Sequence, residues 1–274
     1  MIVDRWKQLI EENPHVCFGD TPQCRSKNKY LFLVECMAVS PQLYDTSIWQ
    51  RYKGIITWNN VLYIKYKRNF NVVKIHGFPI PYTNTLDNYT PYDKKILGVI
   101  LLCRHRKSTH SNGDITHLRL DTMKKLSKKL VADCYGKIPY GEQLYKGVVG
   151  ETKEETFPGS VSKLQTLDKY MYNLSFENCY HSEHSNGYIT EKIFDAFRAK
   201  VVPIYYGCYN IEEYVPSELF IDYRKFDSVD KLSEYLISFP RDKYESMVTR
   251  AFDFALHTDC GDIDKLDVTL KELK

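Results

Sequence analysis

Long apolar segments are missing from this sequence. No run of about 18 apolar residues occurs, so we expect no transmembrane helix. The first residues, MIVDRWKQLIEENPH, carry charges in every turn and do not resemble a signal peptide. A large net charge is missing too, because 38 Lys and Arg oppose 35 Asp and Glu and leave +3. Such a small charge argues against a nucleic-acid-binding protein that relies on a basic surface.

Paired cysteine motifs are also absent. The eight cysteines include no CxxC pair, and several lie in apolar runs, such as Cys36 in LFLVECMA and Cys103 in VILLCRH. Such cysteines behave as small buried apolar residues, so we expect reduced thiols, as in a cytoplasmic protein. Cys17 and Cys24 could pair, but nothing else in the sequence indicates an oxidising compartment.

Signatures of metal and phosphate-loop chemistry are missing as well. His105, His110 and His117, and the pair His181 and His184, have no spacing that fits a tetrahedral site with cysteine. No pair of acids of the D-x-D type follows a predicted strand, and Gly-rich phosphate loops and a nucleophile elbow are absent. We therefore expect no bound metal ion, and P-loop enzymes and hydrolases are disfavoured.

What the sequence does contain is an alternation of short apolar runs with amphipathic segments. Strands are predicted at residues 29–35, 54–58, 72–77, 95–103, 130–136, 171–178, 201–207 and 219–223, and helices at 4–12, 47–52, 60–66, 115–130, 163–170, 190–199, 228–237 and, as the last one, near 241–256. This order predicts an α/β fold with parallel sheets and right-handed crossovers. The polar stretch DNYTPYDKK (87–95) would divide the chain into two doubly wound domains, 1–90 and 91–274, with the last helix able to pack on the first domain.

The segment GYITEKIFDAF (187–197), followed by VVPIYYG (201–207), places two charges at the start of a helix between apolar elements. Thr190 is expected to cap this helix through its hydroxyl, and the apolar face at 189, 193 and 197 leaves Glu191 and Lys192 in the first turn, away from the core. A helix N-terminus attracts phosphate, Lys192 adds a full positive charge, and Glu191 can accept hydrogen bonds from sugar hydroxyls. A capped surface helix explains the same residues equally well.

The longer segment LSFENCYHSEHSNGYITEKIFDAFRAKVVPIYYG resembles the signature of the family-ten glycosyltransferases, the α-1,3/4-fucosyltransferases. That signature reads F-E-N, a short loop, Y-[IV]-T-E-K, an apolar helix and V-P-[IV]-x-x-G, and YVPSELFIDYRKFDSVDKLSEYL continues it downstream. The resemblance covers about residues 170–237. It implies a GT-B architecture, in which two Rossmann-like domains face a cleft, the first binding the acceptor glycan and the second binding GDP-fucose. It also implies transfer with inversion and no protein-bound metal.

Within the signature, the resemblance implies that Asn178, Tyr188, Thr190, Glu191 and Lys192 bind the donor. Lys192 would meet the diphosphate, and Glu191 would hold the ribose or the fucose. The loop between residues 178 and 188 is longer here than in the bacterial members of the family.

A second cation is expected at the leaving diphosphate, where negative charge develops during transfer. In the family this second cation is an arginine on the helix that follows the first strand of the donor domain. Arg104, Arg106 and Arg119 are the candidates here, and Arg119 fits best because it opens the helical stretch that leads to LVADCYG. Arg104, directly after the strand, is the second choice. From the residues alone, Arg119 could equally be a solvated charge on a helix.

The catalytic base is expected in the first domain. Inverting transfer needs a group that takes the proton of the acceptor hydroxyl, on the face opposite the diphosphate. Glu35 ends the apolar run LFLVE, where a parallel sheet presents residues to a cleft. The family's base is a glutamate ahead of a Ser-Pro pair, and ECMAVSP has this order with a wider gap. The alternative is a buried glutamate that pairs with a lysine or arginine of its own domain.

Together these features predict an inverting transferase of L-fucose from GDP-fucose to a hydroxyl of an oligosaccharide or lipid-linked glycan, without a bound cofactor. A transferase of another GDP-hexose and a non-catalytic nucleotide- or sugar-binding module are the alternatives. The basic run KKLSKKL (124–130) is most simply the wet face of a helix, and contact with an acidic membrane or a lipid-linked acceptor is the second interpretation. Since no membrane anchor is predicted, we expect a cytoplasmic enzyme of bacterial or viral type.

Overall fold

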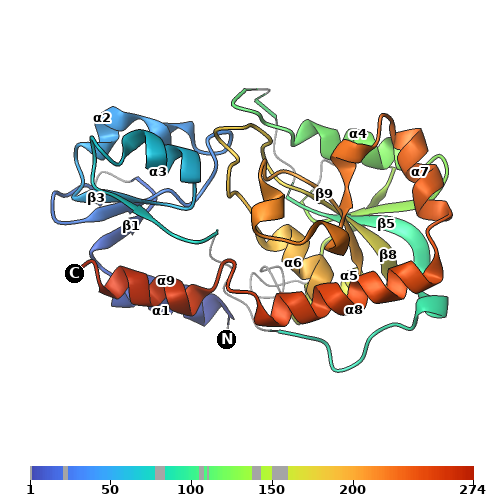
Figure 1. Cartoon of the computed structure of the whole chain (residues 1–274). Helices are drawn as coiled ribbons and strands as arrows, with labels where there is room; N and C mark the ends of the chain where they lie inside the picture. Colours follow the sequence, from blue (N-terminus) through green and yellow to red (C-terminus); the bar gives the residue numbers. More distant parts are fainter. Residues whose placement is uncertain are drawn as a thin grey trace.

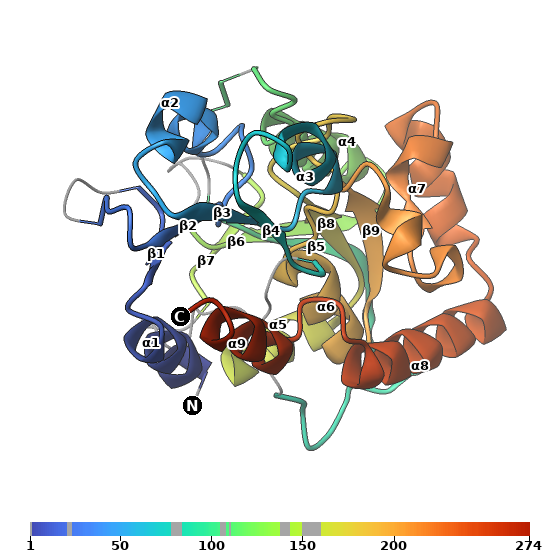
Figure 2. The same ribbon diagram turned by 60° about the vertical axis from the view of Figure 1, so that its left-hand side comes forward.

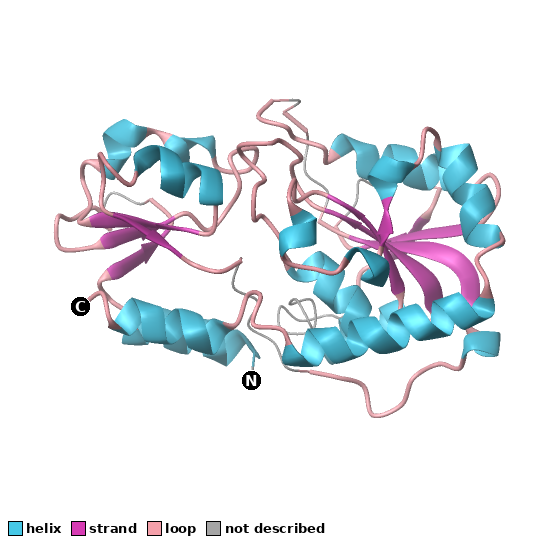
Figure 3. Cartoon of the chain, in the orientation of Figure 1, coloured by secondary structure: helices cyan, strands magenta, loops and turns pink. Residues whose placement is uncertain are grey.

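The computed structural model describes residues 2–20, 24–77, 84–104, 108–109, 111–137, 143–149 and 160–274. Within these residues the chain forms two parallel sheets that lie side by side, a smaller one near the N-terminus and a larger one after residue 95 (Figure 1). Helices cover both faces of each sheet (Figure 3). The α/β fold predicted from the alternation of strands and helices is therefore confirmed.

The smaller sheet contains β1 (Val16–Phe18), β2 (Tyr30–Phe32), β3 (Gly54–Thr57) and β4 (Val72–Lys74), in chain order and all parallel. Its two faces are covered by α2 (Thr46–Trp49) and α3 (Asn60–Tyr66) on one side and by α1 (Ile2–Glu12) and α9 (Ile263–Lys271) on the other (Figures 1 and 2). Successive strand residues point to opposite faces, so Leu31 packs with Trp49 in one buried cluster and Phe32 packs with Leu9 in the other.

The larger sheet has the strand order β10-β9-β8-β5-β6-β7. Its strands are β5 (Ile96–Leu102), β6 (Val131–Tyr135), β7 (Tyr145–Gly147), β8 (Tyr170–Phe176), β9 (Val202–Tyr206) and β10 (Ile221–Asp222), and its helices are α4 (His117–Leu126), α5 (Val161–Asp168), α6 (Glu191–Arg198), α7 (Val229–Ile237) and α8 (Arg241–His257). The direction of winding changes between β5 and β8, and ligands of doubly wound sheets bind outside the carboxyl ends of strands at such a point.

Burial explains why the strands of the larger sheet are the clearest in the sequence. All residues of β8 are buried, because helices lie on both of its faces. One face packs on α4 and α7, where Met123 and Leu232 lie in the core, and the other carries α5, α6 and α8. Most of its residues are apolar, and the two polar ones, Asn173 and Ser175, are hydrogen-bonded to each other, while the Ser175 hydroxyl also donates to the Lys192 carbonyl oxygen.

Several predictions of individual helices and strands are wrong. β1, β7 and α9 were not predicted, and the helix at 241–256 is not the last one. That helix, α8, packs on the larger sheet, with Ala251 and Ala255 beside Phe197 of α6. It is followed by α9, whose Leu266 and Leu270 join the core of the smaller sheet. The predicted strand at 29–35 is shorter, since β2 ends at Phe32, and the helix predicted at 115–130 is α4, which covers only His117–Leu126.

The cysteines differ from the expectation in one place. Cys17 and Cys24 form a disulfide, so the prediction that the thiols are reduced throughout is wrong for this pair. The remaining cysteines are not disulfide-bonded, and all of them except Cys103 are buried, as small apolar residues in a core are expected to be. The cytoplasmic location remains a prediction.

The longest described helix, α8, has 17 residues. None of the helices in the described ranges combines the length and the apolar character needed to cross a membrane. Short 3-10 turns join the longer elements, at Pro41–Tyr44, Tyr92–Lys94, Ile211–Glu213, Ser217–Leu219 and Tyr223–Lys225.

Candidate active site

The start of α6 is tied to the end of β8 by a buried carboxylate. Glu177, directly after β8, has no exposed surface, and its two oxygens accept hydrogen bonds from the backbone N–H and the hydroxyl of Thr190, both at 2.7 Å. Thr190 is the N-cap residue of α6, but its hydroxyl makes no capping bond to the helix. The expected capping role is therefore wrong, because the hydroxyl donates to Glu177 instead.

Lys192 lies between acidic side chains. Its Nζ is 3.3 Å from Glu177 Oε2, 3.2 Å from Glu191 Oε1 and 2.8 Å from the hydroxyl of Thr190. Burial lowers the pKa of the Lys192 ammonium, but the carboxylates of Glu177 and Glu191 outweigh burial, so the pKa is raised above its ordinary value. Lys192 is therefore charged and held in place, with a side chain only 17% exposed rather than pointing away from the core.

Glu191 is ionised by its neighbours. Burial raises the pKa of this carboxyl, whereas Lys192 and Lys163 lower it by more, and the result is about 2. The first turn of α6 thus presents a stable ion pair at the carboxyl end of the larger sheet.

Arg119 is the third residue of α4 and is only 4% exposed. Its Nε and Nη2 atoms donate to the carbonyl oxygen of Phe176, at 3.1 and 2.7 Å, and Nη2 also donates to Asn178 Oδ1 at 2.9 Å. Of the two interpretations of Arg119, the solvated helix charge is thereby excluded. Arg119 and Lys192 repel each other, because both cations lie near the end of β8. Arg104 is exposed.

Glu35 reaches this group of residues from the smaller sheet. It lies three residues after β2, and its Oε2 accepts a hydrogen bond from the hydroxyl of Tyr188 at 2.8 Å. The same hydroxyl accepts from Asn178 Nδ2 at 3.1 Å. Burial raises the pKa of the Glu35 carboxyl, and the hydrogen bond from Tyr188 and the charge of Lys192 reduce this effect without cancelling it. A carboxyl with a raised pKa beside a donor site is suited to take a proton.

The structure therefore brings all seven predicted residues into one region, where the carboxyl ends of the two sheets meet. Glu35, Tyr188, Asn178 and Arg119 are joined in series by hydrogen bonds. Thr190, Glu191 and Lys192 form the neighbouring ion-paired turn. The roles assigned to these residues remain predictions.

Glu177 is the functional residue that the sequence analysis missed. The signal was present in the signature, because F-E-N places a carboxylate at the end of a strand that is otherwise apolar. A carboxylate without exposed surface has to be paired, and the nearest cation in the signature is Lys192. A glutamate buried at the end of this strand is therefore expected to pair with Lys192.

The long loop between residues 178 and 188 contacts the smaller sheet's helix α3. Glu183 forms an ion pair with Lys65 at 2.7 Å, and its carbonyl oxygen accepts from Asn59 Nδ2 at 2.7 Å. The rings of His181 and His184 stack on each other, with centroids 4.2 Å apart. In the residues for which the structure gives a description, no group of three or more His, Cys, Asp and Glu side chains is arranged to hold a metal ion.

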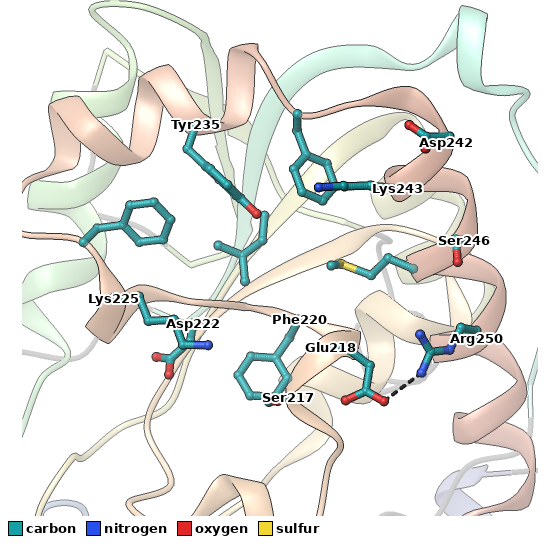
Figure 4. Close-up of a pocket in the computed structure, with 14 residues that line it drawn as sticks. Ser217, Glu218, Phe220, Asp222, Lys225, Tyr235, Asp242, Lys243, Ser246 and Arg250 are labelled. Carbon is teal, nitrogen blue, oxygen red and sulfur yellow. Dashed lines mark hydrogen bonds and ion pairs between the residues drawn. The ribbon is translucent and has the colours of Figure 1, made fainter.

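A separate hollow of about 460 Å³ lies at the β10 edge of the larger sheet (Figure 4). Aromatic side chains from the residues flanking β10 and from α7 and the residues after it line the hollow, together with charged residues of α8. Glu218 pairs with Arg250 at 2.7 Å. None of the seven predicted residues lines this hollow. It is therefore not the candidate active site.

Comparison with solved structures identifies the class of the fold. An α1,3-fucosyltransferase bound to GDP superposes with a TM-score of 0.52 at 15% identity, over 89% of this chain and 78% of the other. Anabaena HepE with UDP-glucose superposes with a TM-score of 0.57 at 11% identity, over 98% of this chain and 80% of the other. An α-glucosyltransferase with UDP-glucose and DNA superposes with a TM-score of 0.57 at 9% identity, over 89% of this chain and 72% of the other. The chain has the GT-B fold of glycosyltransferases, as predicted.

Sequence comparison then identifies the family. The model of glycosyltransferase family 10 (fucosyltransferase), C-terminal part, matches residues 104–255, and the chain belongs to this family. A 4-galactosyl-N-acetylglucosaminide 3-α-L-fucosyltransferase of Mus musculus is 28% identical over 177 residues, 64% of this chain and 42% of the relative. A 3-galactosyl-N-acetylglucosaminide 4-α-L-fucosyltransferase of Bos taurus is 26% identical over 211 residues, which cover 71% of this chain and 50% of the relative. The chain thus spans about half the length of these relatives.

Proposed function

We propose that this chain transfers L-fucose from GDP-fucose to a hydroxyl group of a glycan, in one displacement that inverts the sugar carbon. Membership of the fucosyltransferase family supports the sugar and the donor. The single observation that carries the chemistry is the position of the Glu35 carboxylate. It reaches from the smaller sheet to the hydroxyl of Tyr188, in the signature segment that also supplies Lys192.

In the proposed reaction, Arg119 and Lys192 face the diphosphate. The bond between the fucose carbon and the diphosphate oxygen breaks, and negative charge develops on GDP as it leaves. Two fixed cations stabilise that charge more strongly in a site with little water than in solution. They would allow the reaction to proceed without a protein-bound metal ion. Glu191 would accept hydrogen bonds from the ribose or the fucose.

Glu35 is proposed as the general base. The acceptor oxygen attacks the face of the sugar opposite the diphosphate and passes its proton to the carboxylate. A carboxylate near the sugar ring also stabilises the positive charge that the ring carries in the transition state. The acceptor is proposed to be an oligosaccharide or a lipid-linked glycan, and the names of the relatives point to galactosyl-N-acetylglucosamine units.

The donor is tested by thermal unfolding in the presence of GDP-fucose, GDP-mannose, UDP-glucose and GDP. A ligand at about 100 times its Kd adds about 2.7 kcal/mol to the free energy of unfolding. GDP and GDP-fucose should both protect the chain, and UDP-glucose should not. Protection by GDP-mannose alone would favour another GDP-hexose, and protection by UDP-glucose alone would exclude the proposed donor. Transfer is then measured with N-acetyllactosamine as the acceptor probe, and binding of GDP-fucose without transfer to this probe or to water would favour a non-catalytic module.

A further inference from the structure

Three hydrogen bonds join four side chains in one direction, from the larger sheet to the smaller one. Arg119 Nη2 donates to Asn178 Oδ1 at 2.9 Å, Asn178 Nδ2 donates to the Tyr188 oxygen at 3.1 Å, and the Tyr188 hydroxyl donates to Glu35 Oε2 at 2.8 Å. This series of hydrogen bonds thus begins at the Arg119 guanidinium and ends at the Glu35 carboxylate. Hydrogen bonds arranged in series in this way strengthen one another.

We propose that Asn178 and Tyr188 are positioning residues, which connect Arg119 to Glu35 and hold the Glu35 carboxylate in the orientation required for proton transfer. This inference rests on the proposed function, in which Glu35 is the base. It gives Tyr188 a role through Glu35 rather than through contact with the donor. One carboxylate oxygen is fixed by the phenol, and the other, Oε1, is left to receive the proton of the acceptor.

The packing of Tyr188 supports this role. Its ring is 1% exposed and lies 5.0 Å from the ring of Trp58, within the core of the smaller sheet. Trp58 is fixed in turn, because its Nε1 donates to the carbonyl oxygen of Leu33, two residues before Glu35. A phenol enclosed on these sides has its hydroxyl aimed at Glu35 and Asn178.

The residue before Tyr188 makes this packing possible. Gly187 has a φ of +78°, and a Cβ atom there would lie 2.8 Å from the carbonyl oxygen of Trp58 and 2.9 Å from the hydroxyl of Tyr214. Only glycine adopts this conformation without strain, and only glycine leaves room for the approach. The signature segment is therefore shaped to insert Tyr188 into the smaller sheet's core.

The charges around Glu35 show why such support is needed. Burial and two nearby carboxylates raise the pKa of Glu35, whereas the Tyr188 hydrogen bond and Lys192 lower it. The groups that face Glu35 are Tyr188, Lys192, Glu191 and Glu177, together with Tyr44, whose hydroxyl donates to the Glu35 carbonyl oxygen at 2.6 Å. Removing the Tyr188 hydroxyl takes away a bond that favours the ionised form, so the pKa should rise further.

The test is a titration of Glu35 that does not depend on activity. Full-length protein with ¹³C-labelled glutamate carboxyls is titrated by NMR, and Glu35→Gln identifies the resonance. Tyr188→Phe should raise the pKa of Glu35 by about one unit, a tenfold change in proton affinity. Tyr172→Phe is the matched control, because Tyr172 is a buried tyrosine whose hydroxyl donates to the Leu236 carbonyl oxygen. It should leave Glu35 unchanged.

A double variant tests the series arrangement. Asn178→Ala and Tyr188→Phe interrupt the same series of hydrogen bonds. The shift in the pKa of Glu35 in the double variant should therefore be smaller than the sum of the shifts in the two single variants. Thermal unfolding with GDP separates positioning from donor contact, because Tyr188→Phe should retain the protection that GDP gives to the wild type. Loss of that protection, or a Glu35 titration that Tyr188→Phe does not move, would overturn the inference.

Kinetics separate this inference from the proposed function. With GDP-fucose and N-acetyllactosamine, the acidic limb of the kcat/KM profile should shift to higher pH in Tyr188→Phe. If Glu35→Gln has wild-type turnover while Tyr188→Phe still raises the pKa of Glu35, the assignment of the base is wrong and the hydrogen-bonded chain stands. If the pKa of Glu35 is unchanged while Glu35→Gln is inactive, the base stands and the positioning role is wrong.

Discussion

Glu177 and Thr190 form a two-point contact, in which one carboxylate oxygen accepts the Thr190 backbone N–H and the other accepts its hydroxyl, both at 2.7 Å. This contact joins the end of β8 to the start of α6. Glu177 also pairs with Lys192, so it helps to fix the position of the lysine that we propose as the diphosphate contact.

Glu177→Gln should destabilise the fold and misplace Lys192. The amide keeps the shape but removes the charge opposite the Lys192 ammonium, which is largely buried. The free energy of unfolding should fall by about 2 kcal/mol or more, measured by urea denaturation. Glu183→Gln is the control, since Glu183 pairs with Lys65 on the surface and should cost less than about 1 kcal/mol. An equal loss in the two variants would contradict the role given to Glu177.

Lys192→Ala should weaken the binding of GDP. The variant removes a cation near the end of β8 and takes from the carboxylates of Glu177 and Glu191 the ammonium that they pair with. We expect at least about a tenfold increase in the Kd for GDP, about 1.4 kcal/mol, from calorimetry or thermal protection. Lys129→Ala, which removes an exposed lysine between α4 and β6, should bind GDP as the wild type does. Unchanged affinity in Lys192→Ala would show that the diphosphate lies elsewhere.

Glu35→Gln should separate binding from catalysis. The amide oxygen can still accept the Tyr188 hydroxyl, so the site keeps its shape, but the group can no longer take a proton. Transfer from GDP-fucose should fall by roughly two orders of magnitude or more while the affinity for GDP stays within about twofold. Glu234→Gln, on the surface of α7, serves as the control. Normal turnover in Glu35→Gln would remove Glu35 as the base.

The ion pair of Glu191 predicts a stability change in acid. The pKa of this carboxyl is lowered from 4.5 to about 2, so the folded state favours its ionised form. The stabilisation is complete above the unfolded value of about 4.5 and is lost as the pH falls toward 2. The difference in unfolding free energy between the wild type and Glu191→Gln should therefore shrink across this window. A difference that stays constant with pH would contradict the assignment.

Removal of divalent ions should leave transfer intact. Arg119 and Lys192 are proposed to supply the positive charge for the leaving diphosphate. Assays with GDP-fucose in the presence of EDTA should keep at least about half of the untreated rate. Loss of activity that only a divalent ion restores would require a metal in the mechanism.

Much of the fold could be predicted because its signals are local. β8 and β9 are mostly apolar because both of their faces are buried, and the amphipathic pattern of α6 follows from its place against the sheet. The elements that were missed have weak local signals. β1 and β7 have three residues each, and α9 depends on contacts with α1, which lies at the other end of the sequence. Short elements are stabilised by tertiary packing, which a single-sequence pattern does not contain.

The candidate site also has features that the sequence indicates and features that only the fold reveals. The charges at the start of α6 and the glutamate after β2 could be found from the sequence, since an ionisable residue at the end of an apolar strand stands out. The partners of these charges could not. The hydroxyl of Thr190 could cap a helix or bind Glu177, and only the fold decides between them. Likewise, the hydrogen bond from Tyr188 to Glu35 spans 153 residues and depends on how the two sheets are placed.

The position of α9 makes the chain cross between the two sheets twice. The chain passes from the smaller sheet to the larger one between β4 and β5, and it returns between α8 and α9, where Leu266 and Leu270 rejoin the first core. Two segments of chain therefore join the two halves. A cut at either segment alone would leave the halves covalently linked through the other.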